Sequence, residues 1–343
     1  MIGAAALLTA FEGAPLPDPV RRAAVKVLVN GARRGLIHAP ADADAAFARE
    51  MALRPIAEHT QAANDQHYEL PPAFFEHVLG PRMKYSSCLY PTGAETLAQA
   101  EDLALAETCA HADLKDGQDI LELGCGWGSL SLWMAQTLPG ARITSVSNSA
   151  PQKAFIDQRA RALGLTNLTV VTADMNDFVT QACFDRVVSV EMFEHMANWR
   201  ALLERARDWL KSDGRLFLHV FSHRSTPYRF DADDPVDWIG RYFFSGGVMP
   251  SHRLIREFGD LFAVEADWRW NGGHYARTAE HWLANYDRNA AAIRPVLREV
   301  YGADAVLWRR RWRLFFLATA GLFGHSGGAQ WGVSHYRLSP VHA

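Results

Sequence analysis

Two carboxylates and an imidazole stand close together after an apolar segment in the middle of the chain. Glu191 and Glu194 are three residues apart, and Glu191 and His195 are four apart. On a helix, these spacings place all three side chains on one face. Carboxylates and imidazoles are the groups that enzymes use to move protons, so the cluster predicts an acid–base site. The alternative is an acidic first turn that complements the helix dipole, with His195 capping or packing.

Three glycines at alternate positions form the second chemically suggestive feature. Gly124, Gly126 and Gly128 follow an apolar run and precede a helical pattern. Glycine permits a tight turn and lets a ligand approach the backbone closely. The spacing G-x-G-x-G differs from the G-x-G-x-x-G of pyrophosphate sites. Glu122, two residues before the first glycine, suits the cationic amino-acid end of a ligand better than a diphosphate.

Polar residues after the next strands extend the expected nucleotide site. Where an acid usually holds a ribose, the chain has Asn148 between two serines, so we expect Asn148 and Gln152 to serve instead. Asp174 is placed to accept from the exocyclic amine of adenine, and Met175 to pack on its ring, although Asp174 also suits an ordinary capping role. Val190, which ends the apolar segment before the acid cluster, is assigned to the same site.

The elements that must position these residues alternate between strand and helix. Strand patterns cover 119–123, 142–146, 168–171, 185–190, 215–220, 262–270 and 331–338, and helical patterns cover 95–113, 129–137, 151–163 and 199–211. Alternation at this spacing predicts an α/β, Rossmann-like fold with a doubly wound, mostly parallel, seven-stranded sheet. The carboxyl ends of its strands would bring the glycines and the acid cluster to one edge, where such sheets bind ligands.

The chain divides into three expected parts. Residues 1–75 are rich in alanine and arginine and form a helical N-terminal extension, ended by Pro71-Pro72. Residues 76–222 form the nucleotide-binding core, and residues 223–343 supply lid insertions and the last two strands. Seven of the 11 tryptophans follow residue 230, which predicts a helical, aromatic lid. Aromatic faces attract ammonium and sulfonium groups, but they equally suit an acyl tunnel or a plain core.

Composition excludes several classes of protein. A net charge of −3 argues against nucleic acid as a partner. The four cysteines form no C-x-x-C pair, so no metal site is expected. The apolar start has no basic region of the kind that signal peptides have, and the longest apolar stretch, 314–323, is too short for a membrane span. We therefore expect a cytoplasmic protein. The basic stretch 308–313 suits either a membrane surface or a solvated helix face.

Three motifs together resemble the cyclopropane-fatty-acid synthase superfamily of methyltransferases. They are Tyr85-Ser86-Ser87, LELGCGWGSL at 121–130 and VEMFEHM at 190–196. The superfamily includes cyclopropane synthases and coclaurine N-methyltransferases, and the stretches 271–289 and 322–338 are similar to the coclaurine group. The resemblance implies a class I methyltransferase fold and S-adenosylmethionine as co-substrate. It also implies that Tyr85 and Ser86 contact the methionine end of the cofactor.

The resemblance implies two different active sites, and the chain has some of the residues of each. In cyclopropane synthases a glutamate, here Glu194, holds bicarbonate with a cysteine, a histidine and a tyrosine. The chain matches the last two with His219 and Tyr275, but it has Ser87 at the cysteine position. Those synthases also usually have glycine three residues before the glutamate. Glu191 there matches the coclaurine group, whose catalytic Glu, Glu and His fall on Glu191, Glu194 and His195, although that group tends to have phenylalanine in place of Tyr275.

We therefore expect an S-adenosylmethionine-dependent methyltransferase that N-methylates a small amine. The alternative is transfer of a methyl or methylene group to an unsaturated acyl chain of a phospholipid at a membrane surface, with bicarbonate as a cofactor. A non-catalytic module that only binds the cofactor is disfavoured by the complete acid cluster. The sequence does not identify the acceptor, and it leaves open whether the protein is a homodimer.

Overall fold

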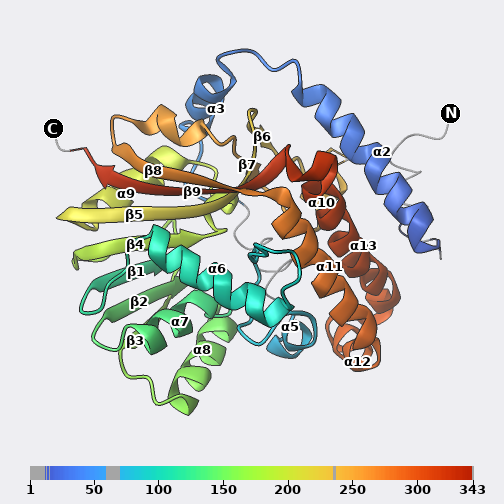
Figure 1. The fold of residues 1–343 in the computed structure, drawn as a ribbon, viewed down its shortest axis with the longest axis horizontal. Coiled ribbons are helices and arrows are strands. Elements are labelled where there is room, and N and C mark those ends of the chain that lie inside the picture. Colours follow the sequence, from blue (N-terminus) through green and yellow to red (C-terminus); the bar gives the residue numbers. More distant parts are fainter. Residues whose placement is uncertain (1–11, 13, 15, 59–69, 235–236, 342–343) are drawn as a thin grey trace.

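A seven-stranded sheet runs through the centre of the computed structural model, which describes residues 12, 14, 16–58, 70–234 and 237–341 (Figure 1). The strands lie in the order β3-β2-β1-β4-β5-β9-β8. Their bounds are β1 Asp119–Leu123, β2 Arg142–Ser147, β3 Leu168–Thr172, β4 Phe184–Val190, β5 Leu210–His223, β8 Phe262–Asn271 and β9 Trp331–Pro340. β9 runs antiparallel to both of its neighbours, and the pairs from β3 to β5 are parallel. The predicted doubly wound, mostly parallel sheet is therefore confirmed.

Helices cover both faces of this sheet because successive strand residues point to opposite sides. In β1, Ile120 packs with α6 (Leu97–His111) and α7 (Ser129–Thr137), whereas Leu121 and Leu123 pack in a second cluster with α3 (Ala43–Met51) and α9 (Trp199–Asp208). α8 (Ala150–Ala162) packs beside α7 and β3. The two faces are thus sealed by separate apolar clusters, and only the ends of the strands remain open for a site.

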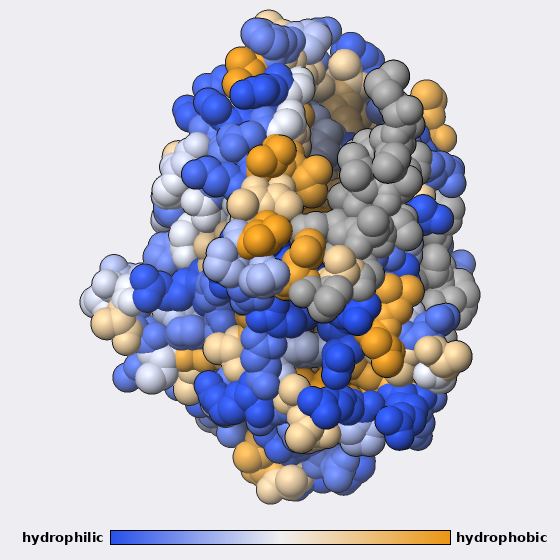
Figure 2. All heavy atoms as spheres, turned by 90° about the vertical axis from the view of Figure 1, so that its right-hand side faces the viewer, coloured by the Kyte–Doolittle hydropathy of each residue, from blue (hydrophilic) through white to orange (hydrophobic). Residues whose placement is uncertain are grey.

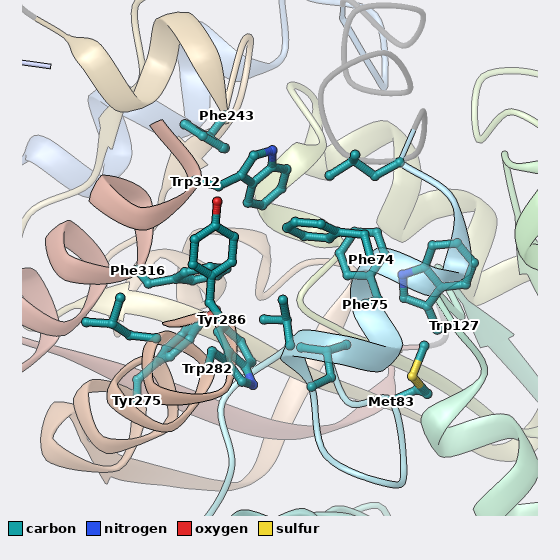
Figure 3. Close-up of a cluster of buried hydrophobic side chains, with 14 of the residues drawn as sticks. Phe74, Phe75, Met83, Trp127, Phe243, Tyr275, Trp282, Tyr286, Trp312 and Phe316 are labelled. Atoms are coloured by element: carbon teal, nitrogen blue, oxygen red, sulfur yellow. The ribbon is translucent and has the colours of Figure 1, made fainter. Parts of the chain in front are cut away.

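The C-terminal helices build an aromatic wall beside the carboxyl ends of the strands. The helices of this part are α10 Trp238–Tyr242, α11 Gly272–Arg288, α12 Ala290–Tyr301 and α13 Ala305–Phe323. Of these, α11 and α12 pack with α5 Pro72–Val78. Figure 3 shows Phe74 and Phe75 of α5 between Trp312 of α13 and Trp127 of the glycine loop, with ring centroids 4.9 Å apart for Phe74–Trp312 and 5.0 Å for Phe75–Trp127. The expected lid is therefore continuous with the core.

The described part of the N-terminal region is helical over 18–36 and 43–51, and it is tied to the C-terminal helices. α2 (Asp18–Leu36) packs on α13. In the basic stretch, Arg311 pairs with Glu12 at 2.8 Å and lies 3.8 Å from the ring centre of Tyr242. Arg313 pairs with Asp18 and Asp287. Arg311 and Arg313 thus form ion pairs within the chain. From the sequence we considered only a membrane contact or a solvated helix face for this stretch.

Three details differ from the sequence-based expectation or fall outside the described residues. Pro71-Pro72 does not only end a segment, since Pro72 occupies the first turn of α5, where a missing N–H is harmless. The helix expected over 199–211 ends at Asp208, because β5 already begins at Leu210. The apolar start at 1–11 lies outside the described residues.

The side of the molecule formed by α2 and the C-terminal helices exposes hydrophobic side chains among hydrophilic ones (Figure 2). An apolar groove there is lined by residues of α2 and α13, such as Val25, Leu28 and Leu322. The groove shares no lining residue with the cavities described below. No described helix combines the length and apolar character needed to cross a bilayer.

Candidate functional site

Two adjoining cavities lie at the carboxyl ends of the central strands, and the glycine loop borders both. Gly124 and Gly126 line both cavities. Both have positive φ, at 77° and 51°. A Cβ at Gly126 would point into open space, so a ligand can approach the backbone there, whereas a Cβ at Gly124 would lie 2.4 Å from Cγ of Met192. Gly128 lines neither cavity; it packs against Ile156 at the start of α7.

The larger cavity contains buried polar atoms that suit a polar ligand. Thr108 Oγ1, Ser129 Oγ and Gln152 Nε2 have no hydrogen-bond partner among the described residues. Gln152 is held in place because its Oε1 accepts a hydrogen bond of 2.7 Å from Ser147 Oγ. Buried polar groups without partners are rare, so these three atoms indicate a ligand that would satisfy them.

Glu122 forms part of the wall of the larger cavity. One carboxylate oxygen accepts hydrogen bonds from the hydroxyls of Ser131 and Ser145. Burial raises the pKa of Glu122 to about 7, while these hydroxyls act in the opposite direction. A cation beside this carboxyl would favour its ionised form, as the sequence-based assignment to an amino-acid end requires.

The smaller cavity brings together the residues expected at the ribose and adenine. Asn148, Asp174 and Met175 line it, and Gln152 reaches it from α8. Asp174 also accepts a hydrogen bond of 2.8 Å from the N–H of Asn176. Asp174 therefore lines the cavity and also holds the turn that follows β3; no described helix begins there for it to cap.

Glu191 lies where the two cavities meet, and its carboxylate is held from three sides. It accepts hydrogen bonds from the N–H of Ser87 at 2.9 Å and from the hydroxyl of Tyr275 at 2.6 Å. Nε2 of His219 lies 3.2 Å from its Oε1. The backbone φ of Glu191 is 47°, in the left-handed region, which a residue other than glycine adopts at a cost of about 1–2 kcal/mol. Such strain is typical of functional positions.

Glu194 and His195 lie on a short 3-10 helix, η1 (Phe193–His195), rather than on the expected α-helical face. His195 lines both cavities, and its ring centre lies 4.3 Å from that of Phe244. Glu194 is fully buried and lines neither cavity. Its Oε1 accepts from the N–H of Phe221 at 2.6 Å, and burial together with Glu191 raises its pKa well above the usual value. Glu194 therefore lies behind the site, in surroundings that disfavour its ionised form.

Lys84 is a functional candidate that sequence reasoning missed. Its buried Nζ donates to Ser86 Oγ and to the carbonyl of Ser87, both at 2.6 Å. It thereby fixes the segment whose N–H groups and side chains face the site. Glu101, also buried, accepts from the N–H groups of Gly80, Arg82 and Lys84 and shapes the preceding turn. The only sequence signal was the position of Lys84 directly before Tyr85, which lines the larger cavity together with Ser86 and Val190.

Cys88 does not replace the cysteine expected in a bicarbonate site. Its side chain is fully buried and lines neither cavity. Burial raises the pKa of this thiol to about 12. Of the aromatic residues predicted for a lid, Phe244, Tyr275 and Trp282 line the larger cavity, and Phe315 joins them.

Comparison with known proteins places this chain in a known family. The family model described as mycolic acid cyclopropane synthetase matches residues 57–326. The (S)-coclaurine N-methyltransferase of Thalictrum flavum subsp. glaucum is 35% identical over 82% of this chain and 79% of its own length. The cyclopropane-fatty-acyl-phospholipid synthase of Escherichia coli strain K12 is 32% identical over 75% of this chain and 63% of its own length. A crystal structure of coclaurine N-methyltransferase bound to N-methylheliamine and S-adenosylhomocysteine matches with a TM-score of 0.93, at 30% identity, over 97% of this chain and 98% of that one.

Proposed function

The chain belongs to the mycolic acid cyclopropane synthetase family and is an S-adenosylmethionine-dependent methyltransferase, and from this premise we propose that its acceptor is a small amine. The resemblance to the coclaurine group supports an amine, and the similarity to the Escherichia coli synthase keeps an acyl chain as the alternative. The choice between the two depends on what the cradle around Glu191 holds.

The carboxylate of Glu191 carries the proposal because it fills the place of a bound bicarbonate. The resemblance implies four groups around that anion, namely Glu194, the residue at the cysteine position, a histidine and a tyrosine. Glu194 accepts from the N–H of Phe221. Here Ser87, His219 and Tyr275 all bind the carboxylate of Glu191 instead. His219 and Tyr275 match the synthases in sequence, but in this structure they contact the carboxylate of Glu191. A free anion added beside Glu191 would also meet like charge, which is unfavourable at such distances.

The same carboxylate suits a protonated amine. Alkyl amines titrate near pH 10, as lysine does, so most arrive as cations without a free electron pair. Glu191 would attract such a cation, accept its proton and leave the nitrogen able to attack. His195 would orient the acceptor from the opposite wall, and Phe244, Tyr275 and Trp282 would surround its charge with aromatic faces. Glu194, which lines neither cavity, would support η1 and the backbone of Phe221 rather than act on the acceptor.

The cofactor would occupy both cavities. When bound, S-adenosylmethionine supplies a methyl group on a positively charged sulfur, which is already activated for transfer. Tyr85, Ser86 and Glu122 would hold its amino-acid end, and the backbone at Gly124 and Gly126 would face it. Gln152 and Asn148 would bind the ribose, and Asp174 and Met175 the adenine. With both partners held in this way, positioning supplies most of the catalysis.

Methyl transfer from labelled S-adenosylmethionine in bicarbonate-depleted buffer tests the proposal. Coclaurine and heliamine, the demethylated form of N-methylheliamine, are the first amines to test, with phospholipid vesicles carrying unsaturated chains as the other arm. We expect labelled amine, no dependence on bicarbonate, and a rate that rises with pH as the acceptor loses its proton. Labelled lipid that appears only with bicarbonate would refute the amine and establish the alternative.

A further inference from the structure

A buried lysine with only neutral hydrogen-bond partners lies beside the larger cavity. Lys84 is 2% exposed and lines that cavity. Its Nζ donates to Ser86 Oγ and to the carbonyl oxygen of Ser87, both at 2.6 Å, and it forms no ion pair within the described part of the chain. Burying an ammonium group is costly unless an anion compensates its charge. The position of Lys84 therefore calls for an anionic partner.

The two carboxylates nearest in effect to Lys84 are engaged elsewhere. The carboxylate of Glu191 accepts from the N–H of Ser87 and from two side chains of the site. The carboxylate of Glu101 accepts from N–H groups of the turn at 80–84. Burial lowers the pKa of Lys84, whereas Glu191 and Glu101 act in the opposite direction without contacting its ammonium group. A closer anion would stabilise the charged form further.

The hydroxyl of Ser86 links the ammonium group to the cavity. Ser86 lines the larger cavity, and its Oγ accepts from Nζ of Lys84. A serine hydroxyl that accepts in this way keeps its own hydrogen for donation. Among the described residues, that hydrogen has no acceptor. Hydrogen bonds in a chain polarise one another, so a hydroxyl bound to a cation is a stronger donor. Ser86 therefore suits an anion in the cavity.

A second hydroxyl of the same cavity also needs an acceptor. Thr108 lies on α6 and is 1% exposed, and its Oγ1 has no hydrogen-bond partner in the part of the chain that the structure describes. Thr108 and Ser86 both line the larger cavity, although they come from different segments. Buried hydroxyls without partners are rare, so a ligand with acceptor oxygens is expected here.

The cavity holds one charge of each sign for an amino-acid end. Glu122 lines it and suits the ammonium group of the cofactor. The same end of S-adenosylmethionine also carries a carboxylate, which needs a cation. Among the described residues that line the two cavities, Lys84 is the only lysine or arginine.

We infer that Lys84 is the countercharge for the carboxylate of the cofactor, which it recognises through the hydroxyl of Ser86, with Thr108 as a second donor. Lys84 is thus a positioning residue, because it acts on the cofactor through Ser86. The inference rests on the cofactor placement proposed above, and it is independent of the acceptor.

Calorimetric binding of three ligands tests this role without any acceptor. The ligands are S-adenosylhomocysteine, a decarboxylated analogue that keeps the ammonium group, and a deaminated analogue that keeps the carboxylate. The parent should bind S-adenosylhomocysteine about 10–100-fold more tightly than the decarboxylated analogue, which is the range for a hydrogen bond to a charged group. This ratio measures the preference for the carboxylate.

Lys84→Gln removes the charge but keeps N–H groups that can donate to Ser86 and Ser87. It should bind S-adenosylhomocysteine and the deaminated analogue about 10–100-fold more weakly, and the decarboxylated analogue within about twofold of the parent. Lys84→Met should show the same pattern. If Lys84 only held the segment in place, Lys84→Gln would bind like the parent, or the lysine variants would weaken all three ligands equally.

Two variants test the hydroxyls separately. Ser86→Ala leaves the lysine in place and should also lose the preference for the carboxylate. Adding Lys84→Gln to Ser86→Ala should cost little more, because the two residues act along one path and their effects are not additive. Thr108→Val keeps the shape of the side chain and should weaken the same two ligands, though less than Ser86→Ala.

Lys211→Gln is the matched control. Nζ of Lys211 also binds two oxygens, one from Asp119 and one from Asp185, but Lys211 lines neither cavity. This variant should bind all three ligands as the parent does. Thermal unfolding checks that each variant is folded. Should both Lys84 variants fail to fold, Ser86→Ala decides: a kept preference for the carboxylate refutes the inference, and a lost one supports it.

The outcomes separate the role of Lys84 from the cofactor placement. If Glu122→Gln loses the preference for the ammonium group while the Lys84 variants keep that for the carboxylate, the placement stands and the role of Lys84 is wrong. Equal weakening of all three ligands in the Lys84 variants would show a merely structural role and also overturn the inference. If the parent does not distinguish the three ligands, the placement fails and the role of Lys84 fails with it.

Discussion

Glu191→Gly should remove the side-chain carboxylate and leave a binding site for a small carboxylate ion in its place. The substitution leaves the N–H of Ser87, the hydroxyl of Tyr275 and the imidazole of His219 around an empty space. Formate or bicarbonate fits that space and provides the oxygens that these groups now bind. We therefore expect amine methylation to fall by about 10²–10⁴-fold, as for the loss of a general base, and to recover with added formate.

The stability change can be worked out from the same contacts. Three hydrogen bonds at about 0.5–1.5 kcal/mol each are lost, or about 3 kcal/mol in all. Relief of the left-handed φ returns about 1–2 kcal/mol. The greater backbone freedom of glycine subtracts about 0.5–1 kcal/mol, so the net loss is about 2 kcal/mol. Formate at ten times its Kd would restore about 1.4 kcal/mol, because it binds only the folded state.

Two assays and one matched variant decide the matter. Thermal unfolding with and without formate should show a shift in Glu191→Gly but not in the parent, and labelled methyl transfer should follow the same pattern. Glu191→Gln keeps the shape of the side chain without the base, so it should be slow and should not respond to formate. Rescue of both variants, or of neither, would show that the cradle around Glu191 does not act as argued.

Three other substitutions test separate parts of the site. Gly126→Val should abolish cofactor binding measured by calorimetry, because the valine side chain fills the open space at the loop. Gly164→Val should leave binding unchanged, because Gly164 also has a positive φ but lies in an open turn away from the cavities. Equal cofactor affinities of the two variants would show that the loop does not bind the cofactor. Cofactor affinity should weaken by up to about tenfold per pH unit below pH 7, because Glu122 must lose its proton to face a cation. Glu122→Gln should bind weakly with no such slope, and an unchanged slope would exclude Glu122 as the cause. Glu194→Gln should lower kcat less than Glu191→Gln, since Glu194 lines neither cavity. The reverse order would place Glu194 on the acceptor.

Local pattern was enough to predict the glycine loop and the sheet. The apolar run at 119–123 ends at the first glycine, and β1 and α7 have the predicted bounds. The hydrophobic pattern did not predict the start of β5. Lysine, serine, aspartate and glycine follow Leu210, yet Leu210 begins the strand because it pairs with Phe184 of β4. Tertiary pairing thus overrides a local turn signal.

The site was predicted in its parts but not in its arrangement. The sequence placed Glu191, His219 and Tyr275 in competing active sites, and it could not show that the last two bind the first. Hydrogen bonds between residues so far apart depend on strand register and on how α11 packs, which no short window of sequence contains.

The position of β9 has a consequence for synthesis of the protein. β9 contains residues 331–340 and lies between β5 and β8, so both neighbours stay unpaired on that side until these residues leave the ribosome. At about 5–20 residues per second, residues 224–330, which lie between the end of β5 and the start of β9, take several seconds to be made. During that time β5 and β8 are unpaired edges of the kind that promote aggregation. Nascent chains stalled before residue 331 should therefore need chaperones, and the full chain should release them once β9 inserts.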